Sequence, residues 1–589
     1  MSKPTHKLIF FTLIIILSLR LIYLFTCRTS YFCDEVYTYG ISNSLGNPVL
    51  VWNDAAEIST DEYNSYRGEW YDGSTLHNYL TIESEERFHF YDVILNKSWD
   101  NAPPNYELLV HFVCSFFPES FSWAYAFIVN FIFYAASLIL VFFISKDTLK
   151  NQSSKYFNAI SCMVFFGLSI CGTGAFTFLR MYGVLCFYSL LMIFAIQRII
   201  NNINNKIFDY ALLSISFFGG IFTHTLFIIF AFWITLFTCI YLLTKKQIKK
   251  SLISGSTVLL SLITFLLIYR FNFSKIDSWM GNQNSDGYSF ATKLSVANSY
   301  TFTQSIGFYI PFSYANILTW LGIVIFVAII LTLMCFLFRK EKWFKSIKDK
   351  TVYRLKNISN YISKSTKEIS PLVLIMFFSS IGYLLVISAI SPIVTQGIYS
   401  VRYLLLCMNP MIICFISFID SFFINVHSRK RIIGNSLIIL FLSCLLIIQN
   451  HVYQNPLIFS NHDDHMKLHD LVSDKDVAVF TSRNALLNLM IIPLRDSDHF
   501  YFEKISSDIE YDFTVPDKDF YIVIDESVFN TSGESTVTYY NYIPGINNSS
   551  EFISYIMKDN TEDYSITEID EYIINRGLYS VYHLEPKQK

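Results

Sequence analysis

The chain has 589 residues, of which 53% are hydrophobic and only 15% are charged. An ordinary soluble domain has about 25% charged residues, so this composition argues against a soluble protein and is typical of a polytopic membrane protein. The formal net charge is −3, which excludes the strongly basic balance typical of nucleic-acid-binding proteins. We therefore expect the lipid bilayer, and no nucleic acid, among the partners.

Long apolar runs separate the charged segments. A hydrocarbon core about 30 Å thick needs about 20 apolar residues per helix. Eleven runs meet or approach this length, and we expect each to cross the bilayer: 7–27, 121–145, 157–175, 181–199, 207–221, 223–244, 251–270, 312–338, 370–391, 402–424 and 433–450. The sequence therefore predicts an all-α polytopic membrane fold.

The basic residues predict the orientation of these spans. Lys3 and Lys7 precede the first run, which lacks a small-residue cleavage site and is interpreted as a retained span. Basic loops stay in the cytoplasm. A cytoplasmic N-terminus and alternating spans put five basic loops inside: "SKDTLK", "QRIINNINNK", "TKKQIKK", "RKEKWFKSIKDK" and "HSRKR". We expect a multi-pass protein of the cell membrane.

The segments on the opposite face are acidic. Residues 28–117 hold 14 Asp and Glu against 4 Lys and Arg, and residues 451–589 hold 24 against 10. Residues 271–311 form a second, Ser- and Asn-rich outer loop. The sequence thus predicts a membrane module over 1–450, whose first outer loop has amphipathic helices, and an extracytoplasmic tail over 451–589.

The tail has the pattern of a small α/β domain. Strand-like runs ("DVAVFTS", "DFYIVIDES", "GLYSVYHLE") alternate with helix-like ones ("NALLNLMIIPL", "SEFISYIMKD"). The tail also contains "NHDDHMKLHD", where His462, His465 and His469 have nearly helical spacing. Two interpretations are open, an exposed helix face or a metal site.

The eleven cysteines lie mostly in apolar runs, where they are interpreted as small buried hydrophobic residues. Only Cys27, Cys33 and Cys114 lie near the predicted outer face, where a disulfide bridge among them is open. No Cys or Cys/His spacing typical of a metal site occurs.

An adjacent acid pair follows the first span. Asp34 and Glu35 lie in "YFCDEVYTYG", at the predicted membrane–water boundary. Alone, such a pair is typical of a solvated turn. The aromatic segment that follows can lie in the interface. Arg20 lies inside the first span, where a charge is costly. Either snorkelling of its side chain or a carboxylate partner at the same interface explains it.

A second polar stretch is "SWDNAPPNYELLVHF", residues 98–112. Asp100 precedes the corner made by Pro103 and Pro104, and proline is favoured at the start of a helix. The helix that follows presents His111 on its polar side, either as an interfacial histidine or as a ligand.

Three further polar features lie at predicted outer helix ends. They are Arg180 with Tyr182, His224 in a helical hairpin, and Arg402 with Tyr403. Each alone is typical of an interfacial anchor. Together they place acids opposite fixed arginines on one membrane face. This arrangement suits a lipid-linked phosphate and a hydroxylated acceptor.

The order of these motifs resembles a family of membrane enzymes. The motifs are Arg20, "DEVYTY", "DNAPPNY" (100–106), "RMY" (180–182), "TH" (223–224) and "RY" (402–403). The set resembles the C-type membrane glycosyltransferases of the protein O-mannosyltransferase and aminoarabinose-transferase group (bacterial family-39-like members), over residues 8–450. Where that family often has "HPPLYY", this chain has "APPNYE", with Ala102 in place of the histidine and Asn105 in place of the leucine.

The resemblance implies a polyprenyl-phosphate-linked sugar as donor and transfer outside the cytoplasm to a protein, a lipid or a wall polymer. It implies a first-loop acid as general base, here Asp34, with Glu35 orienting it or its surroundings. Asp100 would position the acceptor or share a divalent cation, Mg²⁺ or Mn²⁺, with Asp34. The lipid phosphate would lie against Arg180, Tyr182, Arg402 and Tyr403, and the other candidate site residues are Arg20, His111 and His224.

Two other function classes compete with a transferase. A transporter or flippase of lipid-linked glycans would concentrate charge near the bilayer midplane in repeated halves. Here no repeat is found in the sequence and the acids lie in an outer loop. A cell-envelope assembly protein would use its spans only as an anchor, for which eleven spans are many.

Overall fold

The computed structural model describes most of the chain. The described residues are 3–51, 66–98, 102–150, 155–201, 206–269, 288–306, 367–391, 394, 401–422, parts of 436–448, 464–482, 484–505, 513–529, 546–574 and 577–587. The chain divides into two compact units. Unit 1 is Met1–Tyr23, Asn130–Thr177 and Met181–Leu457, and unit 2 is Leu24–Val129, Phe178–Arg180 and Ile458–Lys589.

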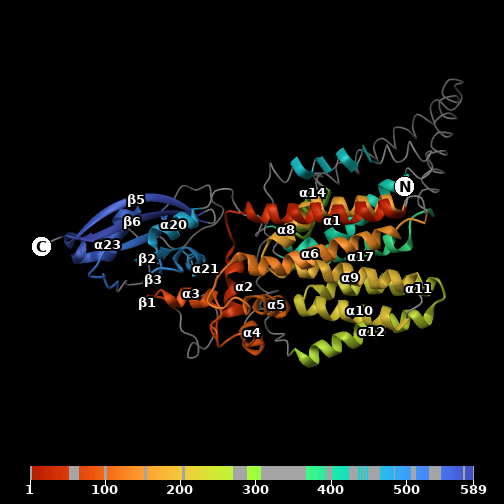
Figure 1. Ribbon diagram of the computed structural model, residues 1–589, viewed down its shortest axis with the longest axis horizontal. Coiled ribbons are helices and arrows are strands. Elements are labelled where there is room, and N and C mark those ends of the chain that lie inside the picture. Colours follow the sequence, from red (N-terminus) through yellow and green to blue (C-terminus); the bar gives the residue numbers. More distant parts are fainter. Residues whose placement is uncertain are drawn as a thin grey trace, which may run out of the picture. The chain divides into compact units, whose positions relative to one another are not determined.

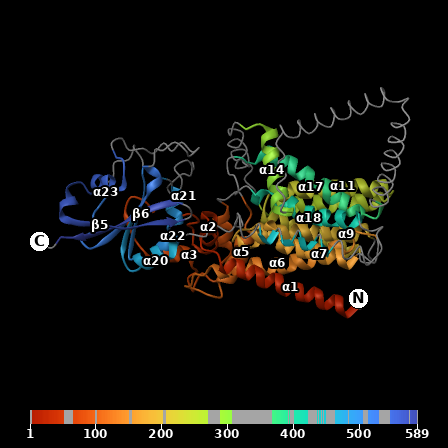
Figure 2. The same ribbon diagram turned by 90° about the horizontal axis from the view of Figure 1, so that it is seen from above.

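Unit 1 is built from helices, and Figures 1 and 2 show its long helices side by side. Two of them, α1 (Lys3–Thr26) and α6 (Trp123–Lys146), extend into unit 2 at one end. The others are α7 (Lys155–Leu168), α8 (Ile170–Thr177), α9 (Tyr182–Ile200), α10 (Lys206–Thr223), α11 (Phe227–Thr244), α12 (Ile248–Ile268), α14 (Phe290–Ile306), α17 (Pro371–Ile390) and α18 (Val401–Phe422).

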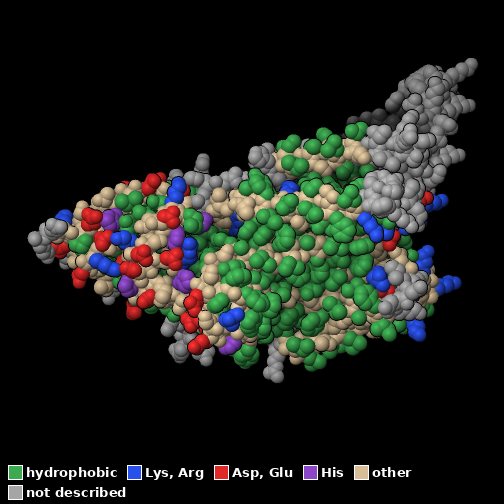
Figure 3. All heavy atoms as spheres, viewed as in Figure 1, with side chains coloured by type: hydrophobic (Ala, Val, Ile, Leu, Met, Phe, Trp, Pro, Cys, Tyr) green, Lys and Arg blue, Asp and Glu red, His purple; other side chains and the backbone are tan. Residues whose placement is uncertain are grey.

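Within the described ranges, seven helices are long and apolar enough to cross a membrane: α1 from Lys7 onward, α6, α9, α11, α12, α17 and α18. The pair α7 and α8 makes an eighth if it counts as one bent span. Large apolar side chains such as Leu8, Leu252 and Leu267 are exposed on these helices. Figure 3 shows a mostly hydrophobic surface over them. These features support a multi-pass membrane protein.

The predicted run 157–175 is broken rather than continuous, because α7 and α8 meet at a bend of 53°. Ser169 lies at the break. Its Oγ donates to the carbonyl of Phe166 (2.8 Å) and accepts from the N–H of Gly172 (3.0 Å). A Cβ atom on Gly172 would lie 2.0 Å from the Phe166 oxygen. The bend therefore depends on a hydroxyl that replaces helical hydrogen bonds and on a glycine that permits the close approach.

Three other predictions about the spans have mixed outcomes. The outer loop predicted over 271–311 contains a helix, α14, which packs against α17 and α18. This helix was not predicted because its sequence is rich in polar residues. The predicted span 312–338 lies outside the described residues, and 433–450 is described only in part. The count of eleven spans stays a prediction.

Unit 2 combines helices of the first long loop, residues 28–117, with a small sheet. The loop contributes α2 (Cys33–Asn43), β1 (Trp70–Asp72), α3 (Ser74–Leu80), α4 (Phe90–Lys97) and α5 (Asn105–Cys114). The tail contributes α20 (His465–Val472), β2 (Asp476–Thr481), α21 (Asn484–Leu489), α22 (Ile491–Leu494), β3 (His499–Lys504), β4 (Phe520–Asp525), α23 (Ser549–Met557), β5 (Tyr564–Ile574) and β6 (Gly577–Pro586), with short 3₁₀ turns at Glu526–Val528 and Lys558–Asp563.

The strands form one six-stranded sheet in the order β1-β3-β2-β4-β6-β5. Strand β2 is parallel to both β3 and β4, and the other pairs are antiparallel. The three predicted strand runs are confirmed as β2, β4 and β6. Strand β1 comes from the first loop and pairs with β3, Trp70 lying opposite Tyr501. The loop and the tail therefore share one sheet.

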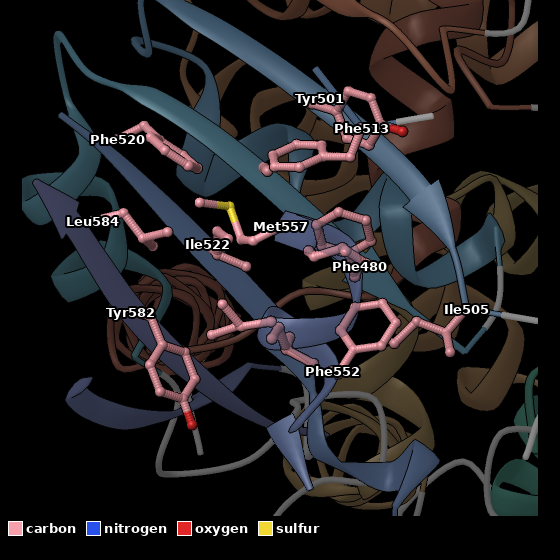
Figure 4. Close-up of a cluster of buried hydrophobic side chains, with 14 of the residues drawn as sticks. Phe480, Tyr501, Ile505, Phe513, Phe520, Ile522, Phe552, Met557, Tyr582 and Leu584 are labelled. Carbon is pink, nitrogen blue, oxygen red and sulfur yellow. The ribbon is translucent and has the colours of Figure 1, made fainter. Parts of the chain in front are cut away.

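One face of this sheet carries a hydrophobic core. Figure 4 shows Phe480, Phe520 and Ile522 from the strands packed against Phe552 and Met557 of α23. All five side chains are almost fully buried. This core fixes α23 against the strands and stabilises the sheet as a folded unit.

Candidate functional site

The acid pair lies at the start of α2. Glu35 is the third residue of this helix, and its Oε2 accepts a hydrogen bond from the backbone N–H of Phe32 at 2.8 Å. A carboxylate that reaches back over the first turn is half of a capping box and satisfies an otherwise unpaired N–H group. The sequence "FCDE" thus starts the helix and fixes the direction of its first turn.

Glu35 is fully buried and joins three segments of the chain. Its carboxylate accepts hydrogen bonds from both terminal nitrogens of Arg28, with Nη1 at 2.7 Å, and from the backbone N–H of Leu179 at 2.7 Å. This bidentate pair is a strong, charge-assisted contact. Glu35 therefore ties the start of α2 to Arg28 and to the backbone of Leu179. Its role in orienting Asp34 or its surroundings stays a prediction.

Asp34 is half-buried, in contrast to its neighbour. Its backbone carbonyl accepts hydrogen bonds from Nη1 of Arg180 (3.2 Å) and from Oγ1 of Thr38 (3.1 Å). Nη1 of Arg180 also donates to Thr38 Oγ1 at 3.2 Å. The short segment Phe178–Arg180 belongs to unit 2, although both of its neighbours in the chain belong to unit 1. The structure thus brings together two residues that the sequence predicted for one site.

A second buried acid, missed from the sequence, lies beside Arg180. Glu107 on α5 is fully buried, and its Oε1 lies 2.6 Å from Nζ of Lys97 and 3.8 Å from Nη1 of Arg180. Lys97 is also fully buried. Oε2 of Glu107 makes no hydrogen bond with any described residue. A buried charge costs several kcal/mol unless it is paired, so this arrangement is unusual for a loop between two spans.

The sequence does contain a signal for these partners. The acidic first loop has only four cations, Arg28, Arg67, Arg87 and Lys97. Two of them, Arg28 and Lys97, are the partners of the buried acids Glu35 and Glu107. Rare cations in an acidic, partly apolar loop are therefore candidates for buried ion pairs.

His111 lies one turn after Glu107 on α5 and is buried. Its Nδ1 lies 2.6 Å from the carbonyl oxygen of Ser42. Nδ1 therefore donates, and Nε2 is the unprotonated nitrogen of the neutral ring. Burial lowers the pKa of His111, partly offset by the Ser42 contact. This places His111 in the packing between α2 and α5 as a neutral, hydrogen-bonded histidine.

The other predicted site residues lie in unit 1. Nη1 of Arg20 donates to the Gly167 carbonyl at 2.9 Å, so a backbone oxygen is one partner of this charge. The ring of Tyr182 lies 6.0 Å from that of His224. The guanidinium of Arg402 lies over the ring of Tyr403 and donates to its hydroxyl at 3.1 Å.

The predicted metal ligands are tested only in part. Asp100, the proposed partner of Asp34, lies outside the described residues, as does His462. In the part of the chain that the structure describes, no three His, Cys, Asp or Glu side chains are grouped as metal ligands. Cys27, Cys33 and Cys114 are free thiols, so the bridge left open from the sequence is not formed among them.

The two described histidines of the predicted group, His465 and His469, have other partners. The ring of His465 packs edge-on against that of Tyr31, with centroids 5.1 Å apart. His469 accepts from Nη2 of Arg495 through Nε2 at 3.0 Å, and its Nδ1 lies 3.2 Å from the Pro493 carbonyl. The structure therefore uses both as packing and hydrogen-bonding residues of α20.

Comparison with known proteins gives structural neighbours only. No protein-family model matches the sequence, and no curated protein matches it significantly. Among solved structures, the chain is similar to ArnT from Cupriavidus metallidurans in the apo state, with 10% identity, a TM-score of 0.39 and coverage of 93% of this chain and 95% of that chain. It is also similar to ArnT from the same organism bound to undecaprenyl phosphate, with 9% identity, a TM-score of 0.37 and coverage of 95% and 97%.

Proposed function

We propose that the chain is a membrane glycosyltransferase. It moves a sugar from a polyprenyl-phosphate donor to an extracytoplasmic acceptor hydroxyl or similar nucleophile, with inversion at the sugar carbon. The observation that carries the proposal is the contact between Arg180 and Asp34, because it puts a fixed cation beside a half-buried acid on α2. The order of the sequence motifs gives independent support.

Asp34 acts as the general base in this proposal. The acceptor oxygen attacks the sugar carbon, the bond from that carbon to the phosphate oxygen breaks, and the acceptor proton passes to Asp34. A base must lie within about 2.6–3.2 Å of the hydroxyl it deprotonates. Half-burial of Asp34 is compatible with such an approach, whereas full burial of Glu35 is not. Glu35 therefore orients the helix that presents Asp34.

Arg180 stabilises the departing lipid phosphate, together with Tyr182, Arg402 and Tyr403. Fixed cations aimed at developing negative charge are an effective source of catalysis. Asp100 would position the acceptor or share a divalent cation with Asp34.

Reconstituted protein tests this function directly. Vesicles with purified protein receive radiolabelled polyprenyl-phosphate sugars and candidate acceptors, and label transferred to acceptor is measured. Asp34→Asn should abolish transfer. Asp92→Asn is the matched control, since Asp92 lies on α4 of the same loop with about a third of its side chain exposed. Undiminished transfer by Asp34→Asn would refute the mechanism. Movement of intact lipid-linked sugar, without cleavage of its phosphate bond, would favour a flippase.

A further inference from the structure

The helix that carries the acid pair is held on both sides by two consecutive residues of the tail. Before α2, the hydroxyl of Tyr31 donates to the carbonyl of Leu489 at 2.8 Å. After α2, the side-chain amide of Asn488 pairs with the backbone of Val51, accepting from its N–H at 3.2 Å and donating to its carbonyl at 2.9 Å. All four residues are almost fully buried.

These contacts end on a helix that is itself fixed to the sheet. Asn488 and Leu489 close α21, which packs against β2 and β3 of the tail and against α2 (Figure 2). Each of these three hydrogen bonds has a backbone group on one side: the Leu489 carbonyl, the Val51 N–H and the Val51 carbonyl. Hydrogen bonds to backbone fix translation and rotation of a segment more narrowly than apolar contacts, which tolerate sliding.

The first loop is joined to the same sheet at a second place. Strand β1 pairs with β3, and the N–H of Gly73 donates to the Asp498 carbonyl at 2.8 Å. A Cβ atom at Gly73 would lie 1.7 Å from the Ser497 carbonyl oxygen, so only glycine permits this approach. The indole N–H of Trp70 donates to the Thr514 carbonyl at 2.7 Å. The loop is therefore held against the tail at several separate points.

We propose that the tail domain is a positioning element for Asp34, and that Asn488 is its main contact residue. The sheet holds α21, α21 holds both flanks of α2, and α2 presents Asp34 to the acceptor. This inference rests on the proposed function for the role of Asp34, but not for the contacts themselves. It assigns the tail a role inside the reaction site, distinct from capture of the acceptor.

Hydrogen exchange on the full-length protein in lipid nanodiscs tests the structural part. Asn488→Ala removes both bonds to Val51, and Tyr31→Phe removes one hydroxyl. Each lost hydrogen bond should raise the opening equilibrium of residues 32–43 about fivefold, so Asn488→Ala should accelerate their exchange about tenfold or more. Exchange in β2 and β4 should be unchanged, which shows that the sheet is still folded.

Matched control variants lie elsewhere in the tail. Asn548→Ala removes an amide that caps α23, and Tyr564→Phe removes a hydroxyl that donates to the Pro516 carbonyl. Neither residue contacts α2 among the interactions described, and neither control should alter exchange in 32–43. Unchanged exchange of residues 32–43 in both Asn488→Ala and Tyr31→Phe would overturn the inference.

Measuring sugar transfer as well as hydrogen exchange distinguishes a failure of this inference from a failure of the proposed function. In the transfer assay, Asn488→Ala should lower kcat at least about tenfold and leave KM for the donor within about twofold, because the base moves while the phosphate contacts remain. Faster exchange with unchanged kcat would refute positioning. If the wild-type protein transfers no sugar, the proposed function fails, and the exchange measurement alone decides whether the tail holds α2.

Discussion

Nζ of Lys97 lies 2.6 Å from Oε1 of Glu107, and both side chains are fully buried. Removing one partner of such a pair leaves an uncompensated buried charge, which costs about 3–5 kcal/mol. We expect Lys97→Met to lower the free energy of unfolding by about this amount. The double variant Lys97→Met/Glu107→Gln should recover much of the loss. Denaturant unfolding of the detergent-solubilised protein measures both, and a double variant no more stable than Lys97→Met would contradict the pairing.

The two adjacent acids should differ in what their removal costs. Glu35→Gln removes the charge partner of Arg28 in a buried pair and should cost about 3–5 kcal/mol of stability. Asp34→Asn should leave the unfolding free energy within about 0.5 kcal/mol. Asp34 contacts Arg180 through its backbone carbonyl, and an asparagine at this position has the same carbonyl. Thermal unfolding of the two variants, measured side by side, makes the comparison. Equal destabilisation would contradict separate roles.

Arg180 should not be replaceable by lysine. Lys has the charge that Glu107 faces, but its flexible ammonium lacks the planar guanidinium that fixes Nη1 between the Asp34 carbonyl and Thr38 Oγ1. In the transfer assay, we expect Arg180→Lys to lower kcat by about 10-fold to 100-fold. Arg87→Lys is the control, since Arg87 donates to the Ser115 carbonyl in the same loop. Equal kcat values for the two variants would contradict a role for Arg180 in the site.

His111 should make stability depend on pH. Burial lowers its pKa below the ordinary value of 6.5, so the folded state favours the neutral ring. A lowered pKa means that the unfolded chain binds the proton more readily. The contribution is therefore complete above about pH 6.5 and is lost as the pH falls through the lowered pKa.

The variant His111→Asn isolates this effect. Its amide can still donate to the Ser42 carbonyl but does not titrate. We expect the wild type to lose stability relative to His111→Asn between about pH 7 and about pH 5. The exposed ring of His89 lies near His111, with Asp92 beside it. His89→Asn is therefore measured in parallel, and a parallel loss in wild type and His111→Asn would exclude His111 as the cause.

Gly40 on α2 should not tolerate a side chain. A Cβ atom there would lie 1.9 Å from the ring of Tyr79, whose hydroxyl donates to the Pro48 carbonyl. Overpacking of this kind costs about 1–3 kcal/mol, and we expect Gly40→Ala to lower the unfolding midpoint accordingly. Gly255→Ala on α12 is the control, because its nearest neighbour would be the Cys239 sulfur at 3.9 Å. The control should be neutral or slightly stabilising.

The sequence predicted helices and strands best where the pattern of apolar residues is local. Apolar runs predicted the helices at 7–27 and 121–145, and alternation within short β-rich runs predicted β2, β4 and β6. Strand β1 was not predictable, because three residues have no periodicity and depend on pairing with β3, far away in the chain. The bend between α7 and α8 was also not predictable. It depends on one serine and one glycine inside an apolar run that otherwise has the pattern of a continuous span.

Of the candidate site, the sequence predicted some of the polar residues but not their buried partners. Motif order singled out Asp34 and Arg180, which the structure brings together. Lys97 and Glu107 were missed because ten residues and a proline corner separate them, and only packing of α4 on α5 makes them partners. Asn488 had no sequence signal, because an asparagine that bonds to backbone looks the same as one in a turn.

The pairing of Val51 with Asn488 joins residues 437 positions apart. A ribosome that adds roughly 5–20 residues per second needs about 20–90 s to cover that distance. Throughout this interval, the first loop has been synthesised but its partner helix does not exist. Tyr31, Val51 and Trp70 must stay accessible until then, while the intervening spans are made. The order of synthesis therefore leaves the acid-bearing helix incomplete until the tail is made, and a nascent chain that stalls before α21 should be inactive and exposed to proteolysis in its first loop.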